Sequence, residues 1–381
     1  MPLFHLPTRV VTGVGCIAHL GDEAAILGSH ALLVCGAGAA RRVGFLDRLL
    51  GSLAAAGVAA SLFAEVRGEP TIELVEAGIA QLRKDGCEIV VGVGGGSAMD
   101  TAKAIAGLAC LPGSVAEYFQ GRPLEGAGLP LITAPTTAGS GAEVTQNAVL
   151  SDPMRQCKES IRSDDWFARV ALVDPELTSS LPRSVMAATG SDALCQAVEA
   201  FVSTGASPTT DALASEAIRL IGRSLVWAYQ DGTDLEARSD MLYGSLLAGI
   251  ALANARLGGV HGLVHPLGIR YGIPHGTVCG MLLPHVMAYN LPWAEQKYAQ
   301  VGYALGAAPG GLPVAQAARL GVLKVRQLIR RIELPTRLRE FGVTEADFPL
   351  IIQEALPSAS LKHNPRPLAE ADLTAILAAA L

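Results

Sequence analysis

The sequence predicts two domains of different class, an α/β domain in the first half of the chain and an all-helical domain in the second. Up to about residue 180, short β-rich runs alternate with amphipathic helical runs. After Pro182 the runs become long and rich in Ala and Leu, with little β pattern. The length of 381 residues suffices for two domains with separate cores, so we place the domains at residues 1–180 and 181–381.

The alternation in the first half is typical of parallel β-α-β units, in which helices cover both faces of one sheet. Apolar residues at helical spacing mark the helices, and short runs rich in Val, Ile and Leu mark the strands. We predict strands at Ala31–Cys35, Ala60–Phe63, Glu88–Val93, Leu131–Ala134, Cys157–Ile161 and Val170–Pro175, and helices at Val43–Ala56, Thr71–Lys84 and Ala98–Ala109.

The run Val91–Lys103 leads from a strand through the turn Gly94–Ser97 into a helix. Glycines let the backbone approach a phosphate, and a helix start offers free N–H groups and a partial positive charge. A pyrophosphate-bearing cofactor fits this turn. Its glycine spacing differs from a Walker A motif and from the usual dinucleotide fingerprint, so a tight turn without a ligand stays the alternative.

A second turn, Pro135–Thr145, follows the next strand and is rich in Gly and Thr. An open α/β sheet binds its ligand at the carboxyl ends of neighbouring strands. Hydroxyl side chains at that position can donate hydrogen bonds to a phosphate or a ribose. The two turns together favour a nucleotide site.

The second half contains a polar helix face. Asp192, Gln196 and Glu199 lie on one side of a predicted helix, so they indicate a site if that side is buried and a solvated surface if it is not. The helices predicted first in this half are Ala187–Ser203, Pro208–Asp231 and Leu235–Asn254.

The stretch His261–Gly276 holds three of the chain's eight histidines. His261 and His265 are four residues apart and share one helical face, while a Pro before and a Gly after His275 predict a turn or a helix start there. Imidazole binds divalent metals and titrates near neutral pH. A single histidine of this kind is typically a hydrogen-bonded core residue, but three at this spacing predict a site.

Asp192, Gln196, His261 and His275 form a candidate set of four metal ligands. The set combines a carboxylate, an amide oxygen and two imidazoles. A neutral amide oxygen binds iron or zinc more weakly than imidazole does, so Gln196 should lower the metal affinity of the site.

Composition excludes several classes of protein. A net charge of −6 and a pI of about 5.8 argue against nucleic acid or an anionic membrane as main partner. The longest uncharged stretch, Tyr271–Ala294, contains three prolines and makes a poor membrane span. The first residues lack the pattern of a signal peptide, and seven scattered cysteines predict reduced, mostly buried apolar thiols in a cytoplasmic protein.

Six motifs spread over nearly the whole chain are together highly specific: Pro7–Gly13, Gly94–Lys103, Pro135–Thr145, Asp174–Thr178, the histidine stretch and Asn364–Pro367. With them the sequence resembles the iron-containing (group III) alcohol dehydrogenases, which are related to dehydroquinate synthase and glycerol dehydrogenase. The resemblance implies a dehydroquinate synthase-like fold, with an N-terminal nucleotide-binding α/β domain, a C-terminal all-α domain and an active site in the interdomain cleft.

The resemblance implies NAD(P) as the cofactor. Many NAD-preferring relatives carry an Asp after an early strand, where it repels a 2′-phosphate. Here the corresponding turn has no acid and two arginines, Arg41 and Arg42, which slightly favours NADP. The implied cofactor contacts are Gly36, Gly38, Gly94, Gly95, Gly96, Ser97, Asp100, Thr136, Thr137, Ser140 and Lys158.

The resemblance also implies that Asp192, the residue at position 196, His261 and His275 bind a divalent metal, Fe²⁺ or Zn²⁺. The family usually has His where this chain has Gln196. Some relatives, including the maleylacetate reductases, lack a complete ligand set and work without metal. A metal-independent reductase of that type therefore stays the main alternative.

The implied reaction is reversible hydride transfer between nicotinamide and a small alcohol or its aldehyde or ketone, with the metal as Lewis acid. His265 would lie beside the nicotinamide and relay a proton, and His261 and Lys158 complete the predicted catalytic residues. A sugar-phosphate lyase or polyol dehydrogenase fits the histidine spacing less well. A non-catalytic nucleotide-binding protein is disfavoured because these residues are all present, and a homodimer is expected by base rate.

Overall fold

The computed structural model describes residues 4–37, 44–155 and 157–381. The chain divides into two compact units. One contains Leu6–Thr137 and Ala142–Thr178, and the other contains Ser179–Leu381 with Ala138–Gly141 and the segment that ends at His5. The domain ranges 1–180 and 181–381, and the cleft between the domains, stay predictions.

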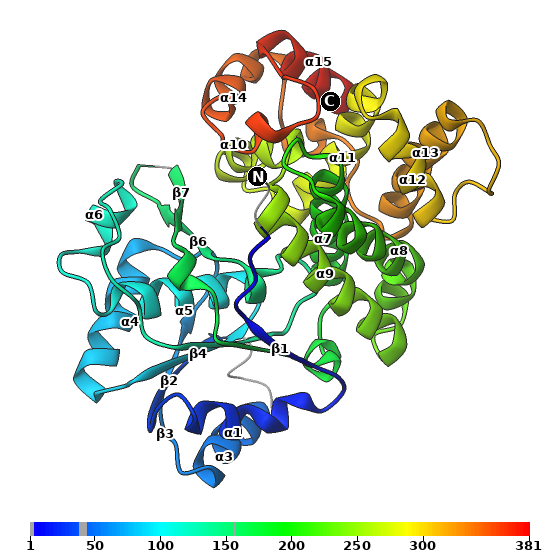
Figure 1. The fold of residues 1–381 in the computed structure, drawn as a ribbon. Coiled ribbons are helices and arrows are strands. Elements are labelled where there is room, and N and C mark those ends of the chain that lie inside the picture. Colours follow the sequence, from blue (N-terminus) through cyan, green and yellow to red (C-terminus); the bar gives the residue numbers. More distant parts are fainter. Residues whose placement is uncertain (1–3, 38–43, 156) are drawn as a thin grey trace. The chain divides into compact units, whose positions relative to one another are not determined.

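The first unit is built on a six-stranded sheet in which all paired strands are parallel (Figure 1). Parallel pairing follows from the helical connections between successive strands, which return the chain to the same edge of the sheet. In spatial order the strands are β1 (Arg9–Thr12), β8 (Val170–Val173), β5 (Leu131–Pro135), β4 (Ile89–Gly94), β2 (His30–Gly36) and β3 (Ala59–Val66).

Helices cover both faces of this sheet because its central strands are apolar on both sides. Leu32 and Val90 lie in one buried core, while their neighbours Leu33 and Val91 lie in a second core on the opposite face. The first core is closed by α4 (Ile72–Asp85), α5 (Gly96–Leu108) and α6 (Val115–Phe119), and the second by α1 (Leu20–Ala25) and α3 (Phe45–Ala55) (Figure 1).

One predicted strand lies outside the parallel sheet. We expected Cys157–Ile161 among the strands of the α/β half, but this segment (β7, Cys157–Arg162) pairs antiparallel with β6 (Asn147–Asp152) in a separate two-stranded ribbon. Its Lys158 and Glu159 are partly or fully exposed, which a strand buried on both faces does not allow. The strands β1 and β6 were not predicted.

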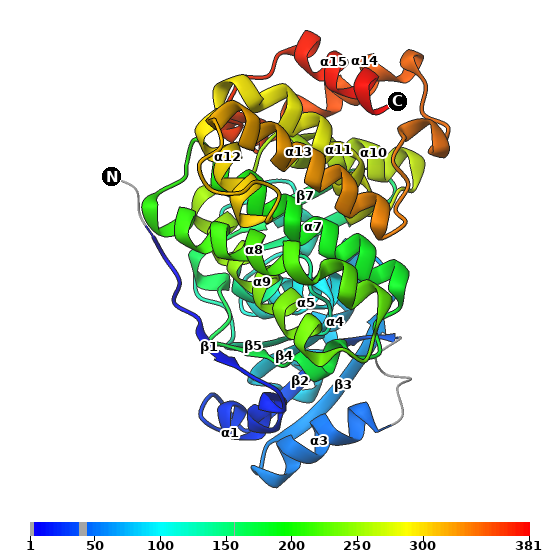
Figure 2. The ribbon, with the colours of Figure 1, turned by 90° about the vertical axis from the view of Figure 1, so that its right-hand side faces the viewer.

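The second unit is all-helical, as predicted, and Figure 2 shows its long helices side by side. Helix α7 is central in it, since it packs against α8, α9, α10 and α11 and is buried along most of its length. The helices are α7 (Arg183–Val202), α8 (Pro208–Gln230), α9 (Leu235–Ala255), α10 (Gly259–Tyr271), α11 (His275–Asn290), α12 (Glu295–Ala304), α13 (Val314–Arg331), α14 (Phe348–Ala355) and α15 (Glu370–Ala380).

Among the described residues, no helix alone is both long and apolar enough to cross a membrane, and α9 and α10 meet that test only as a pair bent by 105°. All seven cysteines are free, and five of them are buried, as the sequence predicted. The predicted fold class, a parallel α/β region followed by an all-helical region, is confirmed.

Candidate metal centre

The polar face of α7 is buried. Asp192, Gln196 and Glu199 are 7%, 4% and 3% exposed, so the interpretation of this face as a solvated surface is wrong. Burying polar groups costs free energy unless each group finds a partner. The three side chains must therefore meet partners from neighbouring helices.

Those partners come from the starts of α10 and α11. His261 stands in the first turn of α10, and His275 is the first residue of α11 after Pro274, which confirms the predicted helix start. Gly276 lets α11 lie directly against α7, because a Cβ at this position would come within 1.9 Å of the carbonyl oxygen of Ala188. Only glycine permits this close approach of the two helices.

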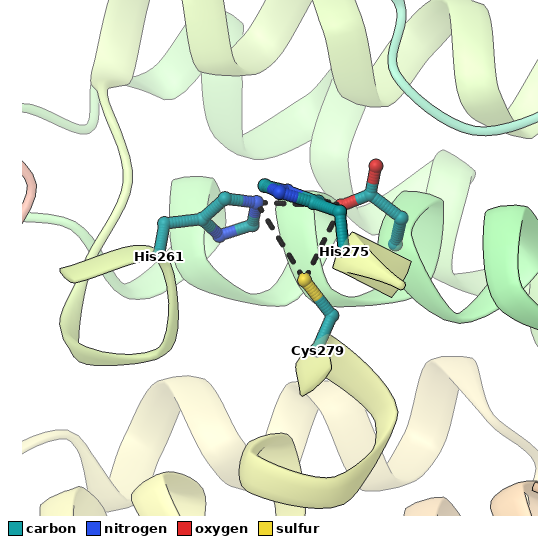
Figure 3. Close-up of side chains that lie close together, drawn as sticks. His261, His275 and Cys279 are labelled. Atoms are coloured by element: carbon teal, nitrogen blue, oxygen red, sulfur yellow. Dashed lines mark hydrogen bonds and ion pairs between the residues drawn. The ribbon is translucent and has the colours of Figure 1, made fainter. Parts of the chain in front are cut away.

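Three side chains converge on one oxygen of Asp192. Its Oδ1 lies 3.3 Å from Nε2 of His261, 3.6 Å from Nε2 of His275 and 3.4 Å from Sγ of Cys279. Figure 3 shows His261, His275 and Cys279 pointing toward one another from α10 and α11. The donor atoms of all four residues lie within 4.8 Å of one another, and we call these four residues the histidine cluster.

Glu199 orients the imidazole of His261. The Nδ1 of His261 donates to Oε2 of Glu199 at 2.6 Å, and the other carboxylate oxygen accepts the backbone N–H of Val260 at 2.6 Å. A histidine that donates from Nδ1 leaves Nε2 as the acceptor, or as the metal-binding atom. Carboxylate–histidine pairs of this kind are usual around metal ions in proteins.

The cluster has strongly perturbed proton affinities. Burial lowers the pKa of the His261 imidazole, but the nearby Cys279, Glu199 and Asp192 outweigh burial and hold that pKa well above its ordinary value. Burial raises the pKa of Asp192, and the histidines His275 and His261 more than reverse this, so the carboxyl pKa lies below its ordinary value. A positive charge is therefore favoured at the centre of this cluster.

The residues fit a divalent cation. A carboxylate and two imidazoles are the donors that zinc and iron prefer. In addition, Oε1 of Gln196, one helical turn beyond Asp192 on α7, is buried and accepts no hydrogen bond within the described part of the chain. A buried amide oxygen without a donor costs free energy, which a cation bound nearby would offset.

His265 follows His261 by one turn of α10. It is partly buried, and the centre of its ring lies 5.8 Å from the ring of His275. The structure thus brings all three histidines of the predicted stretch together, with His265 beside the histidine cluster rather than within it.

Cys279 is the residue that the sequence analysis missed. It was counted among the buried apolar cysteines, although it lies four residues after His275 on the same face of α11. That spacing from a predicted ligand was the signal that pointed to it. Cys195, the other buried cysteine near His261, lies three residues after the predicted ligand Asp192, so spacing alone does not distinguish the two cysteines.

In the α/β unit, the two predicted cofactor turns lie side by side. The backbone N–H of Thr136 donates to the carbonyl of Gly94 at 2.8 Å, and a Cβ at Gly95 would lie 3.3 Å from the side chain of Thr137. Helix α5 begins at Gly96 without a side-chain cap, and residues 95–97 are partly exposed. Its first N–H groups are thus placed to bind an anion.

Other predicted cofactor contacts have partners of their own. Both carboxylate oxygens of Asp100 are engaged, by Nζ of Lys103 at 3.2 Å and by the backbone N–H of Val149 at 3.0 Å. Lys158, on β7, forms an ion pair with Glu69. These contacts account for both side chains without a nucleotide.

The remaining predicted contacts are divided between the units. Ser140 belongs to the segment Ala138–Gly141, which groups with the helical unit. Gly36 ends β2 in the α/β unit. Gly38, Arg41 and Arg42 lie outside the described residues.

Comparison with known proteins covers the whole chain. Residues 7–175 match the model of the iron-containing alcohol dehydrogenases, and residues 186–381 match the C-terminal model of the Fe-containing alcohol dehydrogenase family. The chain is 40% identical to long-chain-alcohol dehydrogenase 1 of Geobacillus thermodenitrificans, over 100% of this chain and 95% of that protein. It is 32% identical to the NAD-dependent methanol dehydrogenase of Bacillus methanolicus, over 100% of both chains.

A solved structure of 1,3-propanediol oxidoreductase superposes with a TM-score of 0.96 at 37% identity and covers 100% of both chains. Identity at this level over the full length shows common descent as well as a common fold. The chain therefore belongs to the iron-containing alcohol dehydrogenase family and is an oxidoreductase.

Proposed function

We propose that this enzyme transfers a hydride between NAD(P) and a small alcohol or its aldehyde, and that a divalent metal on α7, α10 and α11 assists the reaction. The observation that carries the proposal is the convergence of two imidazoles on one oxygen of Asp192, 3.3 and 3.6 Å away, in a buried site. Oxidoreduction between alcohol and aldehyde is the reaction of the family to which the chain belongs.

The relatives support a substrate class rather than one substrate. Their names give long-chain alcohols, methanol and 1,3-propanediol as substrates, so a primary alcohol is common to them while chain length is not. One methylene-sized contact changes preference by about 1–3 kcal/mol, so details of the pocket decide among such alcohols. These matches do not favour the alternative of a metal-independent reductase of the maleylacetate type.

Asp192, His261 and His275 would hold the metal, with the amide oxygen of Gln196 as the fourth predicted donor. When bound, the metal supplies Lewis-acid chemistry, which polarises the substrate oxygen. Glu199 would keep His261 oriented with Nε2 toward the metal. Iron is the metal named by the family, and zinc suits the same donors.

His265 is the proposed proton relay. It lies next to His275 and is partly exposed, so it can exchange protons without being a ligand. Lys158 is the proposed contact to the cofactor, for which it would exchange its ion pair with Glu69.

The cofactor would bind with its pyrophosphate at the turn Gly94–Ser97, where the start of α5 presents backbone N–H groups. The choice between NAD and NADP rests on Arg41 and Arg42. If they bind the 2′-phosphate, Arg41→Ala combined with Arg42→Ala raises KM for NADPH about tenfold or more and leaves KM for NADH nearly unchanged. Equal effects on both cofactors would mean that the arginines do not bind the 2′-phosphate, and the lean to NADP would be dropped in favour of NAD, the cofactor named for the methanol dehydrogenase relative.

The function is tested by following nicotinamide absorbance with a series of primary alcohols and aldehydes. Turnover should appear, fall after exhaustive chelation and return when iron, zinc or manganese is added. Turnover that survives chelation, with no metal by elemental analysis, would favour the metal-independent alternative. If no alcohol or aldehyde supports any absorbance change under either condition, the dehydrogenase proposal fails.

A cytoplasmic location and a homodimer remain proposals. Seven free cysteines are consistent with a reducing compartment. Light scattering on the purified protein gives the mass in solution and tests the dimer directly.

A further inference from the structure

Cys279 is the member of the histidine cluster that the sequence did not predict as a metal ligand. Its Sγ lies 3.4 Å from Oδ1 of Asp192 and 3.9 Å from Nε2 of His261, and the residue is fully buried. Because His275 and Cys279 are one turn apart on α11, Gly276 holds both against α7 through the same close contact. Helical backbone therefore positions this thiol as firmly as it positions the histidine.

The spacing of the donor atoms suits one ion. A tetrahedral ion with bonds of about 2.0–2.3 Å keeps its ligand atoms roughly 3.3–3.8 Å apart. The distances from Asp192 Oδ1 to the three other donors are 3.3, 3.4 and 3.6 Å, and the sulfur lies 3.9 Å from Nε2 of His261. Small side-chain movements would bring all four atoms onto one cation.

The second cysteine near His261 provides a contrast. Sγ of Cys195 also lies 3.9 Å from this ring, but next to Nδ1, the nitrogen that already donates to Glu199 at 2.6 Å. A metal could bind between Cys195, Glu199 and His261 only if it displaced the hydrogen bond between His261 and Glu199. Cys279 faces Nε2, the nitrogen left for a metal.

The predicted ligand set contains only three strong metal ligands, because its fourth member, Gln196, offers a neutral amide oxygen. A neutral amide oxygen is a poor match for zinc or iron, whereas a thiolate is among the strongest ligands of zinc, and a bound dication deprotonates the thiol. We propose that Cys279 binds the metal directly through its sulfur, together with Asp192, His261 and His275. This inference rests on the proposed metal-assisted function and goes beyond it by naming a ligand.

A sulfur ligand changes which metal the site selects. Thiolates bind soft and borderline ions, so the site should prefer Zn²⁺ to Mn²⁺ or Mg²⁺ more strongly than a set made only of oxygen and nitrogen donors. Replacing the sulfur by a hydroxyl should reverse much of this preference. The substitution Cys279→Ser should lower the affinity for Zn²⁺ by about 100-fold or more. Loss of a residue that only hydrogen-bonds to a metal ligand already lowers metal affinity about 10–100-fold.

Absorption spectra of bound cobalt(II) detect a sulfur ligand directly, without a measurement of turnover. Protein stripped of metal is titrated with Co²⁺, and a sulfur ligand produces a strong near-ultraviolet charge-transfer absorption in addition to the weak visible bands of the ion. The wild-type protein and Cys195→Ser should show this absorption, and Cys279→Ser should bind Co²⁺ without it. Its presence in Cys279→Ser, or its absence from wild type that has bound one Co²⁺, overturns the proposal.

X-ray absorption at the zinc edge on the wild-type protein requires no variant. One sulfur at about 2.3 Å, beside nitrogen and oxygen at about 2.0–2.1 Å, is the expected first shell. A shell of nitrogen and oxygen alone rejects Cys279 as a ligand, while the metal-assisted function stands. If neither Co²⁺ nor Zn²⁺ binds in a one-to-one ratio, the ligand proposal and the metal-assisted function fail together.

Discussion

Two buried polar clusters, one in each unit, differ in where their positive charge comes from. In the α/β unit, Nζ of Lys103 donates to the carbonyl of Asn147 at 2.6 Å, contacts the carbonyl and hydroxyl oxygens of Thr145 at 3.2 and 2.9 Å, and pairs with Asp100 at 3.2 Å. The side chain of Lys103 is 1% exposed. We call Lys103, Asp100, Thr145 and the nearby Glu143 the lysine cluster.

The histidine cluster contains no lysine or arginine, so its positive charge has to come from a protonated imidazole or from a bound ion. Its members are a carboxylate, two imidazoles and a thiol, and the neighbouring amide oxygen of Gln196 lacks a donor in the described chain. A buried polar network is stable when every member is satisfied and costly when one is not. In the lysine cluster, Oε1 of Glu143 also lacks a donor in the described chain, but Nζ of Lys103 neutralises Asp100. An ammonium thus supplies the counter-charge of the lysine cluster as part of the fold, whereas a bound ion would supply it in the histidine cluster as part of the function.

The largest effect should follow removal of the lysine from its cluster. Lys103→Met leaves Asp100 buried without its counter-ion, which costs about 3–5 kcal/mol in the free energy of unfolding. Urea unfolding measures this. Arg219→Met, which breaks an exposed ion pair with Glu216, should cost less than about 1 kcal/mol and serves as control. If the two variants are equally stable, Lys103 does not hold the α/β unit together.

Removing a histidine from its cluster should act on activity rather than on folding. A metal contributes several kcal/mol to the transition state, so His275→Ala should lower kcat/KM about 10³-fold and abolish stoichiometric metal. Gln196→Ala, which removes the weaker donor, should lose less than about tenfold. Elemental analysis with steady-state kinetics checks both. An equal loss in the two variants would contradict the ranking of the ligands.

Glu143 makes stability depend on pH. Burial raises its pKa from 4.5 to about 7, although a hydrogen bond from its own backbone and the charge of Lys103 offset part of the effect. The folded protein therefore keeps a proton that the unfolded chain has already lost. The raised pKa makes its full contribution to the free energy of unfolding below pH 4.5. As the pH rises through 7 this contribution is lost, and the free energy of unfolding falls by about 3 kcal/mol.

The substitution Glu143→Gln tests whether the free energy of unfolding falls, as expected, when the pH rises. The variant should lack that decline in the free energy of unfolding between pH 4.5 and 7, and should exceed the wild type in stability at pH 8. Urea unfolding at a series of pH values measures the difference. A wild-type protein whose stability rises over this window relative to the variant would reverse the argument.

The smallest effect concerns Glu199, which contacts the predicted ligand His261 and is not itself a predicted ligand. Glu199→Gln keeps the shape of the side chain and weakens the hydrogen bond that orients His261. Metal affinity should fall about 10–100-fold, with little change in the position of α7. Competition with a coloured chelator measures the affinity, and circular dichroism verifies the helices. Unchanged affinity would mean that α10 alone orients His261.

The histidine cluster was partly visible in the sequence because helical spacing is a local property. The four-residue separation of His261 and His265, the Pro before His275 and the polar face of α7 all follow from short-range geometry. The match of six motifs to one family added the nicotinamide cofactor and its contacts. The lysine cluster was not predicted, because Lys103 meets Thr145 and Asn147 only through chain separations of 42 and 44 residues.

The sequence by itself determined the two fold classes, the order of most strands and helices, the family and three residues of the histidine cluster. Periodicity and turn chemistry encode these features within a few residues. Tertiary structure decided that the ribbon of β6 and β7 stands apart from the main sheet, because pairing between distant strands depends on which faces are covered.

Tertiary structure also decided the role of the two cysteines near His261. Cys195 and Cys279 lie equally far from the ring, at 3.9 Å, but at opposite nitrogens. Which nitrogen is free depends on the hydrogen bond that His261 donates to Glu199, and that contact exists only once α7 and α10 have packed together.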